Sequence, residues 1–136
     1  RPGVPAVEAL VPEGCAVVAD ALRLRRILTN LLDNCARAGA AHVQISSRAV
    51  PDRPGMLEVV VRDDGAGMPQ EAVEHLFDAW EAGASPSRGG GGGRGLGLHV
   101  SRTGARLMGG DLVLRSTGPA GTTFALSLPL PSEVAC

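Results

Sequence analysis

Residues 20–38, DALRLRRILTNLLDNCARA, have the apolar spacing of one amphipathic helix. At ~100° per residue the apolar side chains share one sector, which is typical of a helix packed against a core. They are Leu24, Ile27, Leu28, Leu31, Leu32 and Cys35. Asp20 in the N-cap position and Gly39 after the last periodic residue mark the two ends. The pattern predicts a helix over 20–38 with a buried apolar back.

The other side of this helix carries a polar stripe. Its members, spaced three, four, four and three apart, are Arg23, Arg26, Asn30, Asn34 and Arg37. Two carboxamides one turn apart can offer oxygens to a hydrated metal ion, and flanking arginines neutralise phosphate oxygens. This chemistry suits a magnesium nucleotide. A solvated polar face shows the same pattern, and Arg23 in particular fits the solvated edge of a helix equally well.

Further motifs follow in a fixed order along the chain. They are D-x-G-x-G at 63–67 after an apolar run, LFDAW at 76–80, GRGLGL at 93–98 and GTTF at 121–124. A carboxylate at Asp63 can accept a hydrogen bond from an exocyclic amine such as that of adenine, and the two glycines after it allow close backbone approach. The alternative for 63–67 is a strand-ending turn. Asp64 is interpreted as a solvated turn residue.

Together these motifs resemble the ATP-binding catalytic domain of sensor histidine kinases, a branch of the GHKL ATPase superfamily. That superfamily also includes type II topoisomerases, a heat-shock chaperone family and mismatch-repair ATPases. Residues 28–34 resemble its N box, and the later motifs resemble its first glycine box, F box, second glycine box and G-T strand entry. The resemblance runs from about Val17 to Pro131 and implies a Bergerat-type, two-layer α/β sandwich with a mixed sheet and helices on one face.

The resemblance also assigns roles to residues. It implies that Asn34 binds Mg2+, that Asn30 lies beside the phosphates of ATP and that Arg37 contacts a phosphate, so Asn34 and Arg37 are the catalytic candidates. Asp63 would receive the adenine amine. The remaining nucleotide-binding candidates are Gly65, Gly67, Gly93, Gly95, Leu96, Gly97, Leu98 and Thr122.

The glycine-rich stretch 81–94 is interpreted as an ATP lid. Five consecutive glycines at 89–93 favour a loop without packed structure, and its end would direct backbone N–H groups at a helix N-terminus towards phosphates. A dinucleotide-binding fingerprint is excluded, because such a glycine loop follows a strand in a βαβ unit. By the same resemblance, Phe77 and Trp80 form the apolar hinge of the lid, although both also fit an ordinary core.

Three positions depart from the family pattern. Arg26 stands near the place where ATP-hydrolysing relatives carry a water-activating Glu, which argues against an ATPase. Ala38 replaces the aromatic residue that many relatives place beside the base, so nucleotide binding is expected to be weakened. Arg94 replaces a Thr, Ser or Gln, and either contacts a phosphate or decorates the loop.

Composition fits one domain. The chain has 136 residues, 44% of them hydrophobic, so we expect a single ATP-binding domain over 1–136 in which 1–15 is an upstream segment. A net charge of −1 argues against nucleic-acid binding, and no run reaches the ~20 apolar residues of a membrane span. Three distant cysteines favour neither a disulfide nor a zinc site. We expect a monomeric, cytoplasmic domain of a protein whose other parts can be membrane-anchored.

The remaining secondary structure is expected as alternating elements. Strands are predicted at 7–11, 16–18, 42–46, 57–61, 111–116 and 123–128, with 42–46 and 57–61 forming a hairpin, and helices at 70–80 and 98–108.

None of the three histidines has the sequence context of a phosphoacceptor: His42 lies in a strand, His75 precedes the F box and His99 follows the second glycine box. The chain is therefore expected to supply only the ATP side of a phosphotransfer, without autophosphorylation of its own. The resemblance implies transfer of the γ-phosphate to a histidine on a separate dimerisation domain, and from there to a response regulator. A serine kinase of the anti-sigma type and a non-catalytic nucleotide-binding signalling module remain alternatives.

Overall fold

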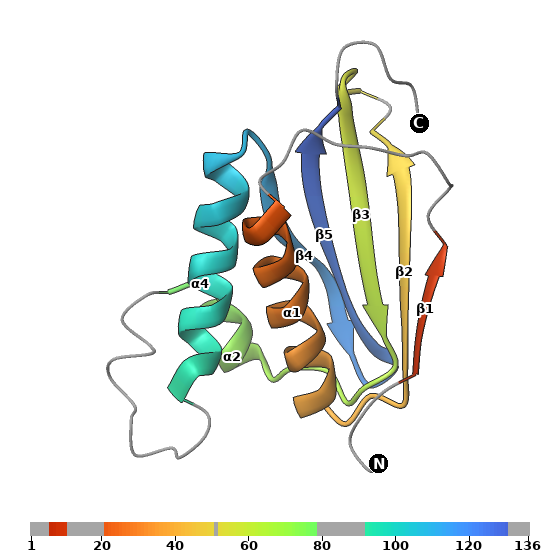
Figure 1. Ribbon diagram of the computed structural model, residues 1–136. Coiled ribbons are helices and arrows are strands. Elements are labelled where there is room, and N and C mark those ends of the chain that lie inside the picture. The colour runs from red at the N-terminus through yellow and green to blue at the C-terminus, as the bar shows by residue number, and fades with distance from the viewer. Residues whose placement is uncertain (1–5, 11–20, 51, 79–91, 131–136) are drawn as a thin grey trace.

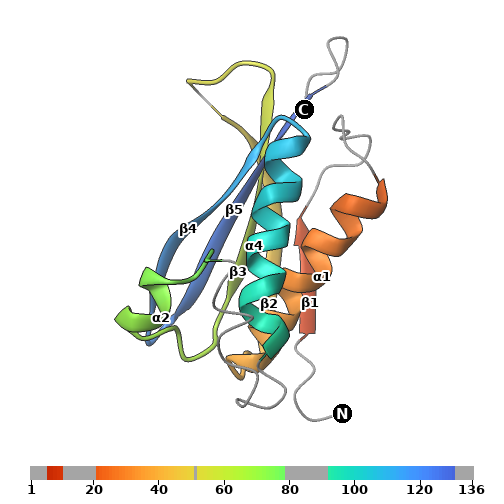
Figure 2. The same cartoon turned by 90° about the vertical axis from the view of Figure 1, so that its left-hand side faces the viewer.

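A mixed five-stranded sheet, covered on one face by two long helices, forms the frame of the protein (Figures 1 and 2). The structure is a computed structural model that describes residues 6–10, 21–50, 52–78 and 92–130. The arrangement confirms the expected two-layer α/β sandwich.

The strands are β1 (Ala6–Leu10), β2 (His42–Ala49), β3 (Met56–Asp63), β4 (Asp111–Gly118) and β5 (Gly121–Pro129). Their order in the sheet is β1-β2-β3-β5-β4. β1 runs parallel to β2, and the other neighbouring pairs are antiparallel. The predicted hairpin is confirmed as β2–β3, although both strands extend beyond the predicted residues. The predicted strand at 16–18 lies outside the described residues.

Helix α1 (Ala21–Arg37) and helix α4 (Gly92–Leu107) lie side by side over the sheet (Figure 1). The apolar back of α1 is buried as its spacing predicted, with Ile27, Leu31 and Cys35 at most 2% exposed. These side chains join a core whose other members include Val43, Val61, Leu98, Leu112, Phe124, Leu126 and Leu128. Among the described helices, none is long and apolar enough to cross a membrane.

Helix α2 (Gln70–Glu74) is much shorter than the predicted helix over 70–80. The chain leaves the helix at His75, where φ is −114° and ψ is 16°. The His75 ring then lies 2.9 Å from the Asp78 carboxylate, across a turn. No residue of α2 is buried, so no apolar face stabilises further turns.

Helix α4 begins at Gly92, six residues before the predicted start at Leu98. The low helix propensity of glycine led to the later prediction, and packing of α4 on α1 outweighs that propensity. The backbones of Gly93, Gly95 and Leu96 are therefore helical, and the end of the predicted lid at residue 94 overlaps this helix. The helix is closed by Gly109 and Gly110: φ of Gly109 is +88°, and Gly110 N–H donates to Ala105 O at 2.9 Å.

Candidate functional site

The end of β3 presents a buried carboxylate. Asp63 is 6% exposed and pairs with Thr122 of β5, itself 4% exposed. Side chains alternate along a strand, so Asp63 points to the same face as the core residue Val61, towards the helices. Its Oδ1 accepts the Gly65 N–H at 2.8 Å. A buried carboxylate is costly without donors, so its remaining acceptor capacity is chemically significant.

The loop after Asp63 needs glycine because other backbone segments approach it closely. A Cβ on Gly65 would lie 2.8 Å from the Ala38 Cβ, at the end of α1. Gly67 has φ of +82°, and a Cβ there would collide with the carbonyl oxygen of Gly118. Ala66 N–H donates to Ala38 O at 3.1 Å. The D-x-G-x-G loop is thus fixed between the end of α1 and the end of β4.

Thr122 lies beside Asp63 at the end of β3. The region formed by Asp63, Gly65, Gly67 and Thr122 is called the corner. The Thr122 hydroxyl lies 2.8 Å from the Thr117 hydroxyl, and Thr117 Oγ1 also accepts the Met68 N–H at 3.0 Å. The structure therefore brings four of the predicted residues together: Asp63, Gly65, Gly67 and Thr122.

The sequence predicts that Asp64 is a solvated turn residue, but its side chain also accepts hydrogen bonds from the start of β2. It is partly exposed, but Oδ1 accepts the N–H groups of Ala41 and His42 at 2.8 and 2.9 Å, and Oδ2 lies 2.9 Å from His42 Nδ1. These contacts, first the backbone hydrogen bond from His42, lower the pKa of Asp64 to about 2. The residue fastens the start of β2 to the end of β3.

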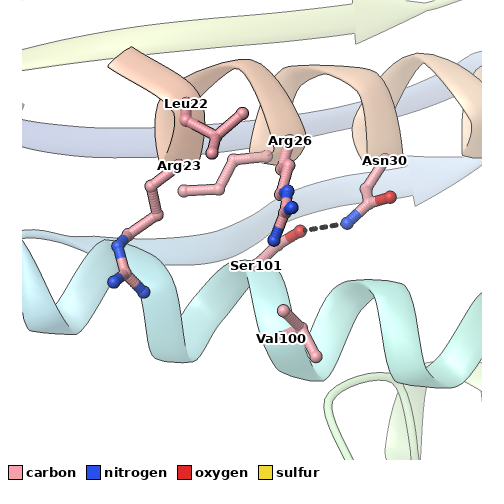
Figure 3. Close-up of a pocket in the computed structure, with 7 residues that line it drawn as sticks. Leu22, Arg23, Arg26, Asn30, Val100 and Ser101 are labelled. Atoms are coloured by element: carbon pink, nitrogen blue, oxygen red, sulfur yellow. Dashed lines mark hydrogen bonds between the residues drawn. The ribbon is translucent and has the colours of Figure 1, made fainter. Parts of the chain in front are cut away.

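The polar stripe of α1 divides into two parts with different surroundings. Asn30 Nδ2 donates to Ser101 Oγ at 2.9 Å (Figure 3). It also donates to Gly97 O at 3.1 Å, so both amide hydrogens bind α4. The Arg23 side chain, which comes from α1, lies against α4: its Cγ would be 3.2 Å from a Cβ placed on Gly104. This half of the stripe joins α1 to α4, whereas the sequence predicts that the whole stripe faces a ligand.

The other half of the stripe lies at the last turn of α1, beside the D-x-G-x-G loop. Asn34 is half-buried, and its side-chain amide makes no hydrogen bond within the described residues. Arg37 is exposed and is the last residue of α1. Ala38, directly after it, is the residue that contacts Gly65 and Ala66. Asn34 and Arg37 therefore lie at the same corner as Asp63.

A small pocket lies at the α1–α4 seam, away from this corner (Figure 3). It has a volume of about 140 Å³ and is lined by Leu22, Arg23, Arg26, Ile27, Asn30, Val100 and Ser101. Pockets for drug-sized molecules are about 300–1,000 Å³, so this one does not fit a whole nucleotide. Arg26 belongs to the seam.

The second glycine motif occupies the first turns of α4. Gly97 faces the Asn30 amide, and Leu98 is 2% exposed in the core, so these two positions contribute to packing. The first N–H groups of any helix lack intrahelical acceptors, and they favour anions.

The F-box segment is tied to α4 through Phe77. Phe77 packs against the core, as expected, and its carbonyl oxygen lies 3.2 Å from His99 Nδ1. The Arg102 guanidinium lies above the Phe77 ring, 4.1 Å from the ring centre. Trp80 and residues 81–91 of the predicted lid lie outside the described residues.

Two contacts of this site were not found in the sequence. Cys35 was assigned only to the apolar face of α1, but its thiol also lies against Asp63; burial, and then the hydrogen bond to Asp63, raise the pKa of Cys35 to about 12. Ser101 is 1% exposed and receives the Asn30 amide. A serine between Leu98 and Ala105 on the buried face of α4 was the available signal for a buried polar contact.

Comparison with known proteins agrees with this arrangement. Residues 19–132 match the family of histidine kinase-, DNA gyrase B- and HSP90-like ATPases. The chain belongs to this family.

Individual relatives include a sensor protein and a sensor histidine kinase. The chain is 37% identical over 131 residues to the aerobic respiration control sensor protein ArcB of Escherichia coli (strain K12), and that match covers 93% of this chain and 16% of ArcB. The fold is similar to the ATP binding domain of PrrB from Mycobacterium tuberculosis, with a TM-score of 0.71, 25% identity and coverage of 97% and 84% of the two chains. It is also similar to the mycobacterial sensor histidine kinase MprB, with a TM-score of 0.68, 28% identity and coverage of 95% and 86%.

Proposed function

We propose that this chain binds ATP with Mg2+ and donates the γ-phosphate to a histidine on a separate dimerisation and phosphoacceptor domain. A response regulator would be the next acceptor in this two-component pathway. The observation that carries the proposal is the corner where Asp63, buried at the end of β3, meets the last turn of α1 with Asn34 and Arg37. Family membership and the ATP-binding domain of PrrB support the same nucleotide.

The base would bind at Asp63. Its carboxylate accepts hydrogen bonds only, so it fits the exocyclic amine of adenine and disfavours the carbonyl that guanine carries at the same position. Gly65 and Gly67 let the loop after Asp63 pack closely against Ala38 and Gly118, and the buried Thr122 pairs with Asp63 on β5.

The phosphates would extend from the base towards Arg37 and the start of α4. Arg37 supplies a permanent positive charge, and the N–H groups of the first turn of α4, that of Gly93 among them, add partial positive charge. Asn30 lies one turn before Asn34 on α1. Only its Oδ1 is left to meet the nucleotide, because both amide hydrogens bind α4. Residues 81–94 would act as the lid, with Gly97 and Leu98 holding its end on α1 and the core.

The Asn34 amide fits a magnesium nucleotide. Among the described residues, no three His, Cys, Asp or Glu side chains converge on one point. Mg2+ usually keeps several waters and takes one or two protein oxygens together with substrate phosphates, so a single free amide oxygen is a suitable contribution. When bound, the ion neutralises charge that develops on the transferring phosphoryl group.

Phosphoryl transfer then depends on positioning. An imidazole nitrogen of the partner domain attacks the γ-phosphorus, the bond from that phosphorus to the bridging oxygen breaks, and ADP leaves. In this chain Arg37 and the α4 N-terminus hold the phosphates, and Asp63 holds the base. Arg26 at the α1–α4 seam provides no carboxylate to activate water, which fits a transferase better than an ATPase.

The proposal is tested with the chain, ATP, Mg2+ and the phosphoacceptor domain of the same kinase. We expect an acid-labile, base-stable phosphohistidine, and no product with the chain alone. An acid-stable phosphoserine would indicate the anti-sigma type of kinase. Bound ATP without any product would indicate the signalling module.

Two variants of neighbouring residues make this test specific. Asn34→Ala should abolish transfer and remove the dependence of ATP affinity on Mg2+ in calorimetry. Asp33→Ala, on the exposed side of the same helix turn, should retain both. Transfer by Asn34→Ala at the wild-type rate would refute the metal-binding role of Asn34.

A further inference from the structure

The pocket at the α1–α4 seam combines positive charge with apolar surface. Its described lining residues include two arginines, Arg23 and Arg26, and no acidic side chain. We propose that this pocket binds a carboxylate side chain of a protein partner, and that the partner is the domain that carries the acceptor histidine. The choice of partner rests on the proposed function, whereas the carboxylate site rests on the pocket itself.

Arg26 is a donor without a partner in the described part of the chain. Its side chain is exposed and makes no hydrogen bond or ion pair with the residues that the structure describes. It reaches from α1 towards α4, and it lines the same pocket as Ser101 (Figure 3). A guanidinium presents its N–H donors in a planar fork that matches the two oxygens of a carboxylate.

Ser101 adds a buried hydroxyl to the same pocket. It is 1% exposed, and its Oγ accepts the Asn30 amide at 2.9 Å. Among the described residues, the hydroxyl hydrogen itself has no acceptor. The Asn30 oxygen points away from Arg26 (Figure 3), so it does not serve as that acceptor. Leaving a buried donor without a partner is unfavourable, and an oxygen of a bound carboxylate would accept this hydrogen.

The charge and the size of the pocket favour a single carboxylate. α1 begins at Ala21 with no acidic residue in its first turn, and Arg25 adds a positive charge beside Arg23 and Arg26. The positive end of the helix dipole acts in the same direction. A volume of about 140 Å³ holds a group of a few heavy atoms and is too small for a drug-sized molecule. The side chain of an aspartate or a glutamate has this size and this charge.

The apolar part of the lining favours a protein partner over a free acid. Leu22 and Val100 are 58% and 47% exposed, and both line the pocket. A small free acid would leave most of this apolar surface in water. A protein segment that inserts a carboxylate would cover the surface and gain the free energy of its burial.

The position of the pocket indicates which protein partner comes close to it. Asn30 lies one turn before Asn34 on α1, and Ser101 lies one turn after Gly97 on α4. The pocket therefore adjoins the proposed path of the phosphates between these helices. A domain that brings a histidine to the γ-phosphate comes within reach of this surface.

The carboxylate site is tested with propionate, which carries one carboxylate on a short apolar stem. It is titrated into the chain against chloride at constant ionic strength, and NMR follows the amide signals of Asn30 and Ser101. The wild-type protein should show saturable shifts, and Arg26→Gln should weaken binding by about three- to tenfold. Arg25→Gln removes the same charge from an exposed position of α1 outside the pocket lining, so this control should retain wild-type affinity. Equal affinity in the wild-type protein and Arg26→Gln, or equal losses in the two variants, would overturn the site.

The protein source of the carboxylate is tested by phosphotransfer to the acceptor domain of the same kinase. Arg26→Gln should raise the KM for the acceptor domain by about three- to tenfold, and leave kcat and the KM for ATP within about twofold. Arg26→Lys keeps the charge without the planar fork and should give an intermediate KM.

Three other outcomes of this assay have distinct meanings. A raised KM for ATP in Arg26→Gln would assign Arg26 to the phosphates and overturn the proposal. An unchanged KM for the acceptor domain, together with propionate binding, would make a free acid the ligand and overturn the protein partner. Absence of transfer by the wild-type protein would refute the proposed function, and the propionate titration would then decide the carboxylate site by itself.

Discussion

The corner at the end of β3 and the α1–α4 seam use similar residues for opposite purposes. Each contains a buried or half-buried polar side chain, Asp63 or Asn30, close to a glycine backbone. At the seam both amide hydrogens of Asn30 bind the protein itself. At the corner, Asp63 keeps acceptor positions, and Asn34 makes no side-chain hydrogen bond within the described part of the chain. Unused hydrogen-bonding capacity therefore separates a ligand site from a packing contact.

Gly67→Ala should give the largest effect on stability. A side chain there must adopt φ of +82° and collides with the Gly118 carbonyl, so we expect a loss of about 2–4 kcal/mol in the free energy of unfolding. Urea denaturation measures the change. Gly39→Ala, which has a similar φ of +76° and no neighbouring atom within 4 Å, is the control for the collision and should cost about 1–2 kcal/mol. Equal losses in the two variants would show that the corner is not tightly packed.

Replacing each of the two asparagines of α1 by alanine, one at a time, sharpens the comparison between the seam and the corner. Asn30→Ala leaves the buried Ser101 hydroxyl and the Gly97 carbonyl without their partner, and should cost about 1–3 kcal/mol of stability. Asn34→Ala should change stability by less than about 0.5 kcal/mol. Denaturation of both variants in the same buffer gives the two values. A larger loss in Asn34→Ala would mean that its amide is structural after all.

Gly97→Ala tests whether this glycine serves the helix seam or the nucleotide. The new Cβ would lie 3.4 Å from Asn30 Cγ, close to ordinary contact, and alanine favours the helix, so stability should rise by up to about 1 kcal/mol. ATP affinity should stay within about twofold if the glycine serves only the seam. A large loss of affinity in a stable variant would show that the phosphates require the bare backbone at Gly97.

Acid should weaken the corner through Asp64, with a smaller effect. The folded pKa of about 2 lies below the ordinary value of 3.8, so the stabilisation is complete above about pH 4 and is lost as the pH falls towards 2. Melting temperatures from pH 5 to pH 2 should therefore fall less steeply in Asp64→Asn than in the wild-type protein. Parallel curves for the two proteins would show that the contacts of Asp64 with β2 do not affect folding.

The sequence predicted those features that depend on local periodicity. The apolar back of α1 and the β2–β3 hairpin are confirmed, and Asp63, predicted to follow a buried strand, is the last residue of that strand. The C-terminal end of α2 and the start of α4 were predicted wrongly. α2 ends at Glu74 because none of its residues is buried, and packing of α4 on α1 outweighs the low helix propensity of its first glycines.

Contacts across the fold were the other features that the sequence could not provide. The five residues of the α1 stripe are indistinguishable by spacing, and only the position of α4 shows that Asn30 is engaged while Asn34 is not. The contacts of Asp63 with Cys35, and of Asp64 with His42, likewise join segments that are 28 and 22 residues apart.

The contacts of His99 and Arg102 with Phe77 have a consequence for how this fold can vary. These contacts join α4, which begins at Gly92, to Phe77. The stretch between Asp78 and Gly92 therefore starts and ends beside the same two contacting segments. The sequence predicts a loop at 81–94, and the entropy of closing a loop grows only logarithmically, by about 0.6 kcal/mol for each doubling of its length. Insertions or deletions between Asp78 and Gly92 should thus be nearly neutral for folding, which leaves the length of this stretch free to diverge while the sheet and helices stay constant.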